Sequence, residues 1–545
     1  MKKLFVFACG LFILFFLFPN PNFAARLRCW CITNYDMPYI KRIIELASEL
    51  GINTIQLNGE PELGGIVNSV DDVLENPKLQ QDLNEIIRLS ASKGIKVQIW
   101  TNEFSNIPFR LLNNEKLNYD YITFWHWMNQ KYDSLFKALP QLNGIVMSFG
   151  TTQISPAKDD LIKSNLPRPE RYASVINLVY QICKSHNRTL FIRNNTWRVS
   201  EMEDFRKALD WVPAEVNIML KASVFDFIQT YPRNPLLGKL APHPQIIELD
   251  LLGLRLGQAN LPWNCVNDLK TQLKSVAVDT GIIGACGHID LYRNSIENSA
   301  NEINLYAFSN LLENPEAPME ELWKRWIGRR YGTKAIPEIV PALKRTEEIL
   351  PKIFYTLGFH FLSQMSNLPP YYQVSNTGLI EFDILVTSQW DKLFKIRGEE
   401  LLIPTTTIVD SVLAEKYEAM SLCRQSLENV ERSISAGWLS GEKAEELNHL
   451  FLKELTCAKI WYAFSDAIFA LRIFRTTPDP LNHDKVKKAL QRLCDIQKET
   501  RNVYGADFRI VQNNKNPENN SWQSIPIHEQ LEQLIQDMEL ELEAE

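Results

Sequence analysis

The sequence is poor in the residues that would mark a metal centre or a disulfide-stabilised protein. Its eight histidines are scattered and form no HExxH motif, and no second Cys/His pair accompanies Cys29 and Cys31 at ligand spacing, so zinc is not expected. Nine cysteines in 545 residues are too few for a disulfide scaffold. No glycine-rich phosphate-binding loop is present, and we therefore expect no metal and no other cofactor.

An excess of positive charge is also missing. The net charge is −7, whereas a nucleic-acid-binding protein usually carries a basic face, so we expect no nucleic-acid partner. Hydrophobic residues make up 45% of the chain and charged residues 23%, which are values typical of globular proteins. We find no internal repeat, and the length predicts two or three domains.

The N-terminal residues have the three parts of a secretory signal. Lys2 and Lys3 precede an apolar run over residues 4–18, and the small pair Ala24-Ala25 follows a stretch with two prolines. The apolar run is short for a transmembrane helix, although an uncleaved anchor is the alternative. We expect residues 1–25 to be removed, the protein to be secreted or periplasmic, and no membrane span to remain.

Residues 26–315 alternate between short apolar runs and helical segments. The apolar runs predict eight strands: Leu27–Thr33, Ile52–Leu57, Ile95–Trp100, Ile145–Phe149, Thr189–Arg193, Val216–Leu220, Gln245–Leu249 and Gly281–Cys286. Seven helical units are expected between them, and Ser299–Leu312 forms another after the last strand. This order predicts an α/β fold, a (β/α)8 TIM barrel with buried parallel strands.

Residues 316–545 lack strand signals and are predicted to form a helical C-terminal domain packed on the barrel. The expected helices are Met319–Gly328, Ile336–Phe354, Ala414–Ala436, Gly441–Arg475, Asp484–Val503 and an acidic last helix after an Asn-rich loop at Gln512–Ser521. The sequence leaves the oligomeric state open, with a dimer through this helical domain as one option.

Lys221 and Asp226 follow the predicted strand at Val216–Leu220 and lie among apolar residues. Loops after the C-terminal ends of barrel strands carry the active sites of TIM-barrel enzymes, so we expect both side chains at the mouth of the barrel. The alternative is a buried ion pair that only steadies the loop.

Other side chains near predicted strand ends could contact a sugar. The aromatic and polar candidates are Trp100, Asn102, Trp197, His288 and Tyr292. Aromatic rings there offer stacking platforms, with packing in the core as the alternative. Arg198, Arg255 and Lys221 could neutralise the carboxylate of a uronic acid.

The segment Lys221–Phe227, followed by Pro235–Gly238, resembles the Lys-Asn-Gly-Pro-Ile-Asp-Phe … Pro-Leu-Phe-Gly segment of glycoside hydrolase family 67, the α-glucuronidases. Asn301–Phe308 is similar to that family's segment after the last barrel strand, and Tyr355–His360 to an element of its helical domain. The resemblance covers about residues 27–365. It implies a barrel hydrolase that removes uronic acid side groups from a plant or microbial polysaccharide or its oligosaccharides.

By this resemblance, Asp226 corresponds to one of two carboxylates that act as catalytic base, and Lys221 to a lysine beside it. Leu254 stands where the second of these carboxylates would be, and residues 148–152 contain no carboxylate where the family has its acid. Two of the three catalytic carboxylates are therefore unmatched.

Glycoside hydrolysis generally needs two carboxylates, one to protonate the leaving oxygen and one to act on water or the anomeric carbon. Asp226 could take either role, depending on its burial. The other carboxylates at predicted strand ends are Glu60, Glu103, Asp250 and Asp290. We consider Glu103 and Asp290 the best placed to be the partner of Asp226.

Three functions remain open. The first is an exported glycoside hydrolase with a relocated acid, and the second is a catalytically silent barrel that binds a glycan. The third is a barrel enzyme of another class, which the fold alone does not exclude. The first two differ in whether a second carboxylate faces Asp226 across the mouth.

Overall fold

The computed structural model describes residues 25–149, 154–195, 199–224, 226–279, 281–360, 366–371, 374, 396–511 and 525–544. Two of the candidate site residues, Trp197 and Arg198, lie outside the described residues. So do the signal segment up to residue 24 and the Asn-rich segment 512–521.

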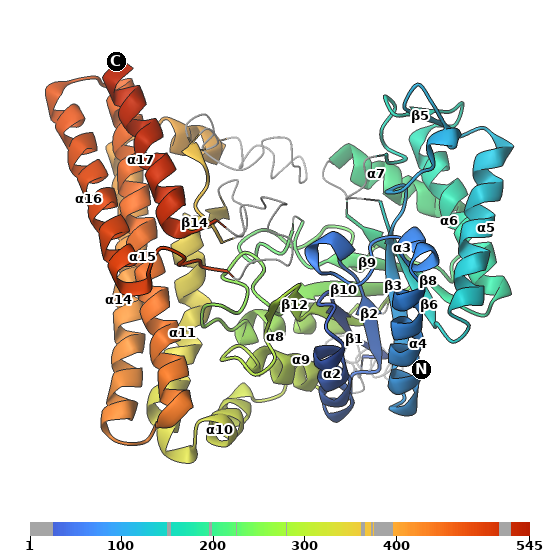
Figure 1. Cartoon of the computed structure of the whole chain (residues 1–545), viewed down its shortest axis with the longest axis horizontal. Helices are drawn as coiled ribbons and strands as arrows, with labels where there is room; N and C mark the ends of the chain where they lie inside the picture. Colours follow the sequence, from blue (N-terminus) through green and yellow to red (C-terminus); the bar gives the residue numbers. More distant parts are fainter. Residues whose placement is uncertain are drawn as a thin grey trace, which may run out of the picture.

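Eight parallel strands close into a barrel (Figure 1). In chain order they are β1 (Leu27–Ile32), β2 (Thr54–Leu57), β3 (Lys96–Asn102), β6 (Gly144–Ser148), β8 (Thr189–Asn194), β9 (Asn217–Lys221), β10 (Gln245–Asp250) and β11 (Ile282–His288). Each strand pairs with its neighbours in this order, and β1 pairs with β11 to complete the ring. The predicted (β/α)8 barrel is confirmed.

Helices surround this ring of strands (Figure 1). They are α2 (Met37–Glu49), α3 (Val70–Glu75), α4 (Pro77–Ser92), α5 (Ile122–Ala138), α6 (Arg168–Ser185), α7 (Val199–Ala208), α8 (Val266–Ala277) and α9 (Ile303–Glu313). The prediction of a helical unit in every crossover is wrong at one place, because the described residues between β9 and β10 form no helix. That connection, residues 222–244, contains four prolines, which disfavour a continuous helix.

Short elements decorate the loops. The 3-10 turns are η1 (Pro61–Leu63), η2 (Phe109–Leu111), η3 (Leu209–Trp211) and η4 (Thr333–Ala335). A small sheet joins β4 (Leu112–Asn113), β5 (Lys116–Asn118) and β7 (Ile162–Lys163), and β12 (Asp290–Leu291) pairs with β13 (Asn294–Ser295) directly after β11.

The C-terminal region is helical, as predicted. Its helices are α10 (Met319–Arg330), α11 (Ile336–Phe354), α14 (Thr406–Ser435), α15 (Gly441–Thr476), α16 (Pro480–Tyr504) and α17 (Ile527–Ala544). The expectation of no strands here needs one correction, since β14 (Tyr355–Thr356) and β15 (Phe359–His360) form a two-residue ribbon around the positive-φ Gly358. Figure 1 shows the long helices together on one side of the barrel.

The helical region docks on the barrel through α8 and the loop before it. The Nδ2 atom of Asn264 donates to the backbone oxygen of Leu343 on α11 at 2.7 Å. The Glu347 carboxylate accepts from the backbone N–H of Asp268 at 2.8 Å. These contacts hold α11 against the barrel next to the C-terminal end of β10.

The barrel interior has an apolar layer beneath its mouth. It consists of Cys29, Cys31, Trp100, Val146, Phe191, Met219, Ile246 and Cys286. Cys29 and Cys31 face the interior together because side chains alternate along a strand. All eight described cysteines are free thiols. Among the described residues, no helix is both long and apolar enough to cross a membrane.

Glu454 of α15 is a fully buried carboxyl group in the helical region, next to the Cys423 thiol of α14. Burial raises its pKa well above the ordinary value, so the folded protein binds this proton more tightly than the unfolded chain. The resulting stabilisation is fully present at acidic pH and is lost as pH rises through the folded pKa.

We therefore expect Glu454→Gln to raise the free energy of unfolding relative to wild type at neutral and alkaline pH. The gain should be about 1.4 kcal/mol for each pH unit above the ordinary glutamate pKa, until the folded pKa is reached. Urea unfolding over a pH series measures this difference. If the free energies of unfolding of the two proteins changed with pH in parallel, Glu454 would be ionised in the folded protein.

Candidate functional site

Six charged or titratable side chains meet at the C-terminal ends of β8 to β11 and in the loops that follow. We call Arg193, Lys221, Asp226, Glu248, Arg255 and His288 the mouth cluster. Arg193 shares the inner face of β8 with Phe191, and Glu248 that of β10 with Ile246, because both lie two residues further along their strands. The C-terminal end of a parallel barrel is where TIM-barrel enzymes place their chemistry.

Glu248 is the most enclosed member of the mouth cluster, with no exposed surface. Its carboxylate accepts from Arg193 Nε at 2.8 Å and Nη2 at 2.7 Å, and it lies 2.7 Å from His288 Nε2. Burial by itself would raise the pKa of Glu248, but the charge of Arg193 and the bond to His288 lower it to about 2. Glu248 is therefore ionised.

Asp226 is held between two cations. Lys221 Nζ lies 2.8 Å from Asp226 Oδ1 and also donates to Asn195 Oδ1 at 2.8 Å, while the Arg255 guanidinium contacts Asp226 Oδ2. Burial opposes ionisation, yet Lys221 and Arg255 hold the pKa of Asp226 well below its usual range. The Asp226 side chain keeps 18% of its surface exposed, so a ligand in the mouth can reach it.

Two aromatic rings connect these ion pairs. The Phe227 ring lies 5.2 Å from Lys221 Nζ and 5.1 Å from the His288 ring. The Trp100 ring packs edge-on against His288 at 5.9 Å, and the Arg193 guanidinium lies 4.8 Å from its centroid. The two carboxylates, Asp226 and Glu248, thus belong to one continuous site.

The backbone at this site is strained. Asp226 has φ 25° and Phe227 has φ 58°, a left-handed region that residues with a Cβ rarely adopt. Gln258 and Ala259, in the loop after Arg255, have φ 49° and 59°. Such conformations cluster at functional sites, where the surrounding structure holds them in place.

Glu103, a predicted partner of Asp226, points away from the mouth cluster. Its carboxylate accepts from Lys131 Nζ at 3.0 Å and from the Tyr132 hydroxyl, both on α5, and it has no exposed surface. Lys131 also lies 3.4 Å from Asp71 on α3. These contacts link β3 to the helices outside the barrel.

We expect Glu103→Gln to lower the free energy of unfolding by about 2 kcal/mol, because Lys131 would stay buried with only Asp71 as counterion. The turnover of the folded variant should equal that of wild type. Glu445→Gln, an exposed change on α15, is the matched control in urea unfolding. A loss of turnover of about 100-fold without a loss of stability would instead identify Glu103 as the relocated acid.

Asp290, the second predicted partner, accepts from the backbone N–H of Thr33 at 2.6 Å and from the Thr33 hydroxyl at 2.8 Å. Asp250 accepts from three consecutive N–H groups, those of residues 252–254. Burial raises the pKa of both carboxyls to about 6, against the effect of these donors. Both tie strand ends to the loops beside them.

The other candidates occupy separate positions at the same end of the barrel. Asn102 hydrogen-bonds through its Nδ2 atom to Asn68, and the Tyr292 backbone N–H donates to Thr33 Oγ1 at 2.8 Å. Glu60 is exposed at the start of η1. Of the predicted substrate-binding residues, Lys221, Arg255, His288 and Trp100 are the ones that the structure brings together.

Arg193 and Glu248 were not among the sequence-based site candidates. The available signal was a charged residue inside each apolar strand, at a position that faces the barrel interior. Within the described parts of the chain, no three His, Cys, Asp or Glu side chains are grouped so as to hold a metal ion.

No protein-family model and no curated protein matches this sequence. Among solved structures, the chain is similar to a GH138 enzyme targeting pectin rhamnogalacturonan II. The TM-score is 0.61 at 13% identity, with 96% of this chain and 84% of that chain covered. An O-GlcNAc hydrolase mutant from Thermobaculum terrenum aligns with a TM-score of 0.47 at 11% identity, covering 96% of both chains. The first of these likenesses establishes a shared fold.

Proposed function

We propose that this protein is an exported glycoside hydrolase that acts on an acidic polysaccharide or its oligosaccharides, with the mouth cluster as its active site. The observation that carries the proposal is that the ionised Asp226 carboxylate and the His288–Glu248 pair lie in one site at the C-terminal mouth of the barrel. The fold shared with a GH138 enzyme adds support by analogy. Removal of uronic acid side groups, as in family 67, is the finer form of this proposal.

The charge of the site favours an acidic sugar. Arg193, Lys221 and Arg255 are three cations that face only two carboxylates. The excess positive charge is only slightly exposed, since the Lys221 and Arg255 side chains keep 10% and 11% of their surface. A uronate carboxylate entering the mouth would neutralise this charge through charge-assisted hydrogen bonds.

Asp226, His288 and Glu248 would have different roles in the reaction. Asp226 is ionised, so it serves as the carboxylate that activates water or attacks the anomeric carbon. His288 is the side chain placed to hold a proton, which it would give to the glycosidic oxygen as the bond to the anomeric carbon breaks. Glu248, 2.7 Å from His288 Nε2, orients the imidazole.

His288→Gln should therefore lower kcat by about 100-fold on natural glycosides, whose leaving oxygen needs a proton. The loss should be much smaller on aryl glycosides with acidic phenols, because these leaving groups depart without protonation. Steady-state kinetics on both substrate types measure the difference, with His483→Gln on α16 as a control. Equal losses on the two substrate types would exclude His288 as the proton donor.

The proposed function is tested by incubating the purified mature protein with glucuronoxylan oligosaccharides, oligogalacturonides, neutral oligosaccharides and aryl glycosides. We expect release of a sugar product from acidic substrates and little from neutral ones. The second candidate is a catalytically silent, glycan-binding barrel, which is favoured by the pairing of both mouth carboxylates with cations. Binding of acidic glycans without turnover of any substrate would establish this alternative.

A further inference from the structure

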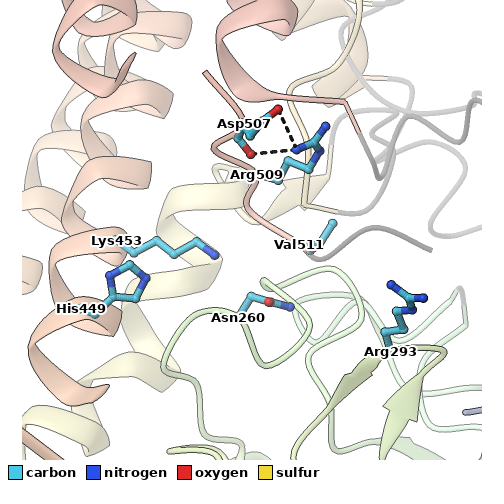
Figure 2. A pocket seen from close by; sticks show the side chains of 7 residues that line it. All are labelled: Asn260, Arg293, His449, Lys453, Asp507, Arg509 and Val511. Carbon is cyan, nitrogen blue, oxygen red and sulfur yellow. Dashed lines mark hydrogen bonds and ion pairs between the residues drawn. The ribbon is translucent and has the colours of Figure 1, made fainter. Parts of the chain in front are cut away.

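A cavity of about 480 Å³ lies between the loops at the barrel mouth and the helical region (Figure 2). The side chains that matter here are Asn260 after β10, Arg293 between β12 and β13, His449 and Lys453 on α15, and Asp507 and Arg509 after α16. The volume is within the range of pockets that hold small ligands.

Lys453 is an ammonium group that is almost fully buried at the cavity, with 8% of its surface exposed. Its Nζ atom donates to the backbone oxygen of Ile510 at 2.8 Å, and within the described chain no carboxylate lies at ion-pair distance from it. Burial lowers the pKa of Lys453 to about 8. An anion bound in the cavity would supply the missing counter-charge, which is valuable to a cation removed from water.

The other charged groups around the cavity do not neutralise the positive charge of Lys453. Arg509 lies 3.6 Å from the Asp507 carboxylate, so these two largely cancel. Arg293 is exposed on the β12–β13 hairpin, and no ion pair engages it in the described structure. Figure 2 shows Lys453 extending from α15 toward the loop of Asn260, with Arg293 on the far side of that loop.

The cavity is built next to the mouth cluster. Arg293 follows His288 of β11 by only five residues, and the Asn260 Nδ2 atom donates to Asn294 Oδ1 at 2.7 Å. Asn294 in turn donates to Gln258 Oε1 at 2.9 Å, in the loop that also carries Arg255. A chain of sugars leaving the mouth on this side would pass Arg293 and Lys453.

We propose that this cavity binds the carboxylate of a second acidic sugar, so that the preferred substrate is an oligomer of uronic acids rather than a glycan with a single uronate. Arg293 and Lys453 would hold the carboxylate, and the Asn260 amide would meet a sugar hydroxyl. The inference rests on the proposed function in one respect, namely that the ligand of the cavity is part of the substrate of the mouth.

The test is calorimetric titration of the full mature chain with an oligogalacturonide, with a xylo-oligosaccharide that carries one glucuronate, and with inorganic phosphate. Arg293→Gln and Lys453→Met should each weaken oligogalacturonide binding about tenfold, the effect of losing one charge-assisted contact. The same changes should leave binding of the single-uronate oligosaccharide unaltered. Lys487→Gln, an exposed charge loss on α16, is the matched control, and Arg293 is itself exposed, so its variant should fold.

Equal oligogalacturonide affinity in wild type and Arg293→Gln would overturn the inference. So would a variant that loses affinity for phosphate but not for the oligogalacturonide, since the cavity would then serve a free anion. Failure of the proposed hydrolase function would give a different result from failure of this inference. In that case no glycoside is hydrolysed, while the Arg293-dependent binding of oligogalacturonide persists and the inference stands for a silent barrel.

Discussion

Asp226→Asn should reduce kcat on acidic glycosides by about 1000-fold, the middle of the range for loss of an acid–base group. The amide keeps the size of the carboxylate, and its one oxygen can still accept from either Lys221 or Arg255, so the fold should persist with a lower stability. What disappears is the negative charge that would act on the anomeric carbon or its water. Steady-state kinetics and a thermal unfolding curve on the same preparation separate the two effects.

The matched control for this change is Asp279→Asn. Asp279 also pairs with an arginine, Arg233, at 2.8 Å, but it precedes β11 and so lies at the opposite end of the strands from the mouth. Its replacement should leave kcat unchanged. If Asp226→Asn retained wild-type turnover, the catalytic site would lie elsewhere.

Glu248→Gln should have the second large effect, lowering kcat by at least 100-fold and destabilising the protein by about 3 kcal/mol. The substitution leaves the Arg193 guanidinium buried without its counterion and removes the partner of His288. Because the folded pKa of Glu248 is about 2, its stabilising contribution is present above pH 4.5 and is lost as pH falls toward 2. The pH dependence of unfolding should weaken in the variant over this window.

The double variant Arg193→Met with Glu248→Leu distinguishes a structural from a catalytic role for this pair. Apolar replacement of both members of a buried ion pair often restores stability, so we expect unfolding close to that of wild type. Turnover should remain as low as in Glu248→Gln. Recovery of turnover together with stability would mean that Glu248 acts only on the fold.

Most of the barrel could be predicted because strands of a parallel barrel are buried on both faces. That burial produces apolar runs such as Ile145–Phe149, and the structure has β6 at Gly144–Ser148. Short elements were missed. The six-residue α3 is set by the capping box of Ser69 and Asp72 rather than by hydrophobic periodicity. The long α14 begins at Thr406, before the predicted start at Ala414, because the Thr405 hydroxyl caps it by accepting from the backbone N–H of Ile408.

The candidate site was partly predictable for a related reason. Lys221 ends β9 and Asp226 follows it by five residues in the next loop, so a local pattern indicates their contact. Arg193 and Glu248 are 55 residues apart, and only closure of the barrel through β9 brings them together. Glu103 lies an odd number of residues after the inward-facing Trp100, which directs it outward to α5.

The most direct test of catalysis by Asp226 is proton NMR of an acidic oligosaccharide incubated with wild type and with Asp226→Asn, recording the anomeric signals over time. We expect a new reducing-end signal with the wild type and none with the variant, while both proteins broaden the signals of the bound sugar. The anomer of the product that forms first would also show whether the configuration at the anomeric carbon is retained or inverted. If both proteins bound every acidic glycan tried but the wild type gave no new anomeric signal, the protein would be a silent glycan-binding barrel and not a hydrolase.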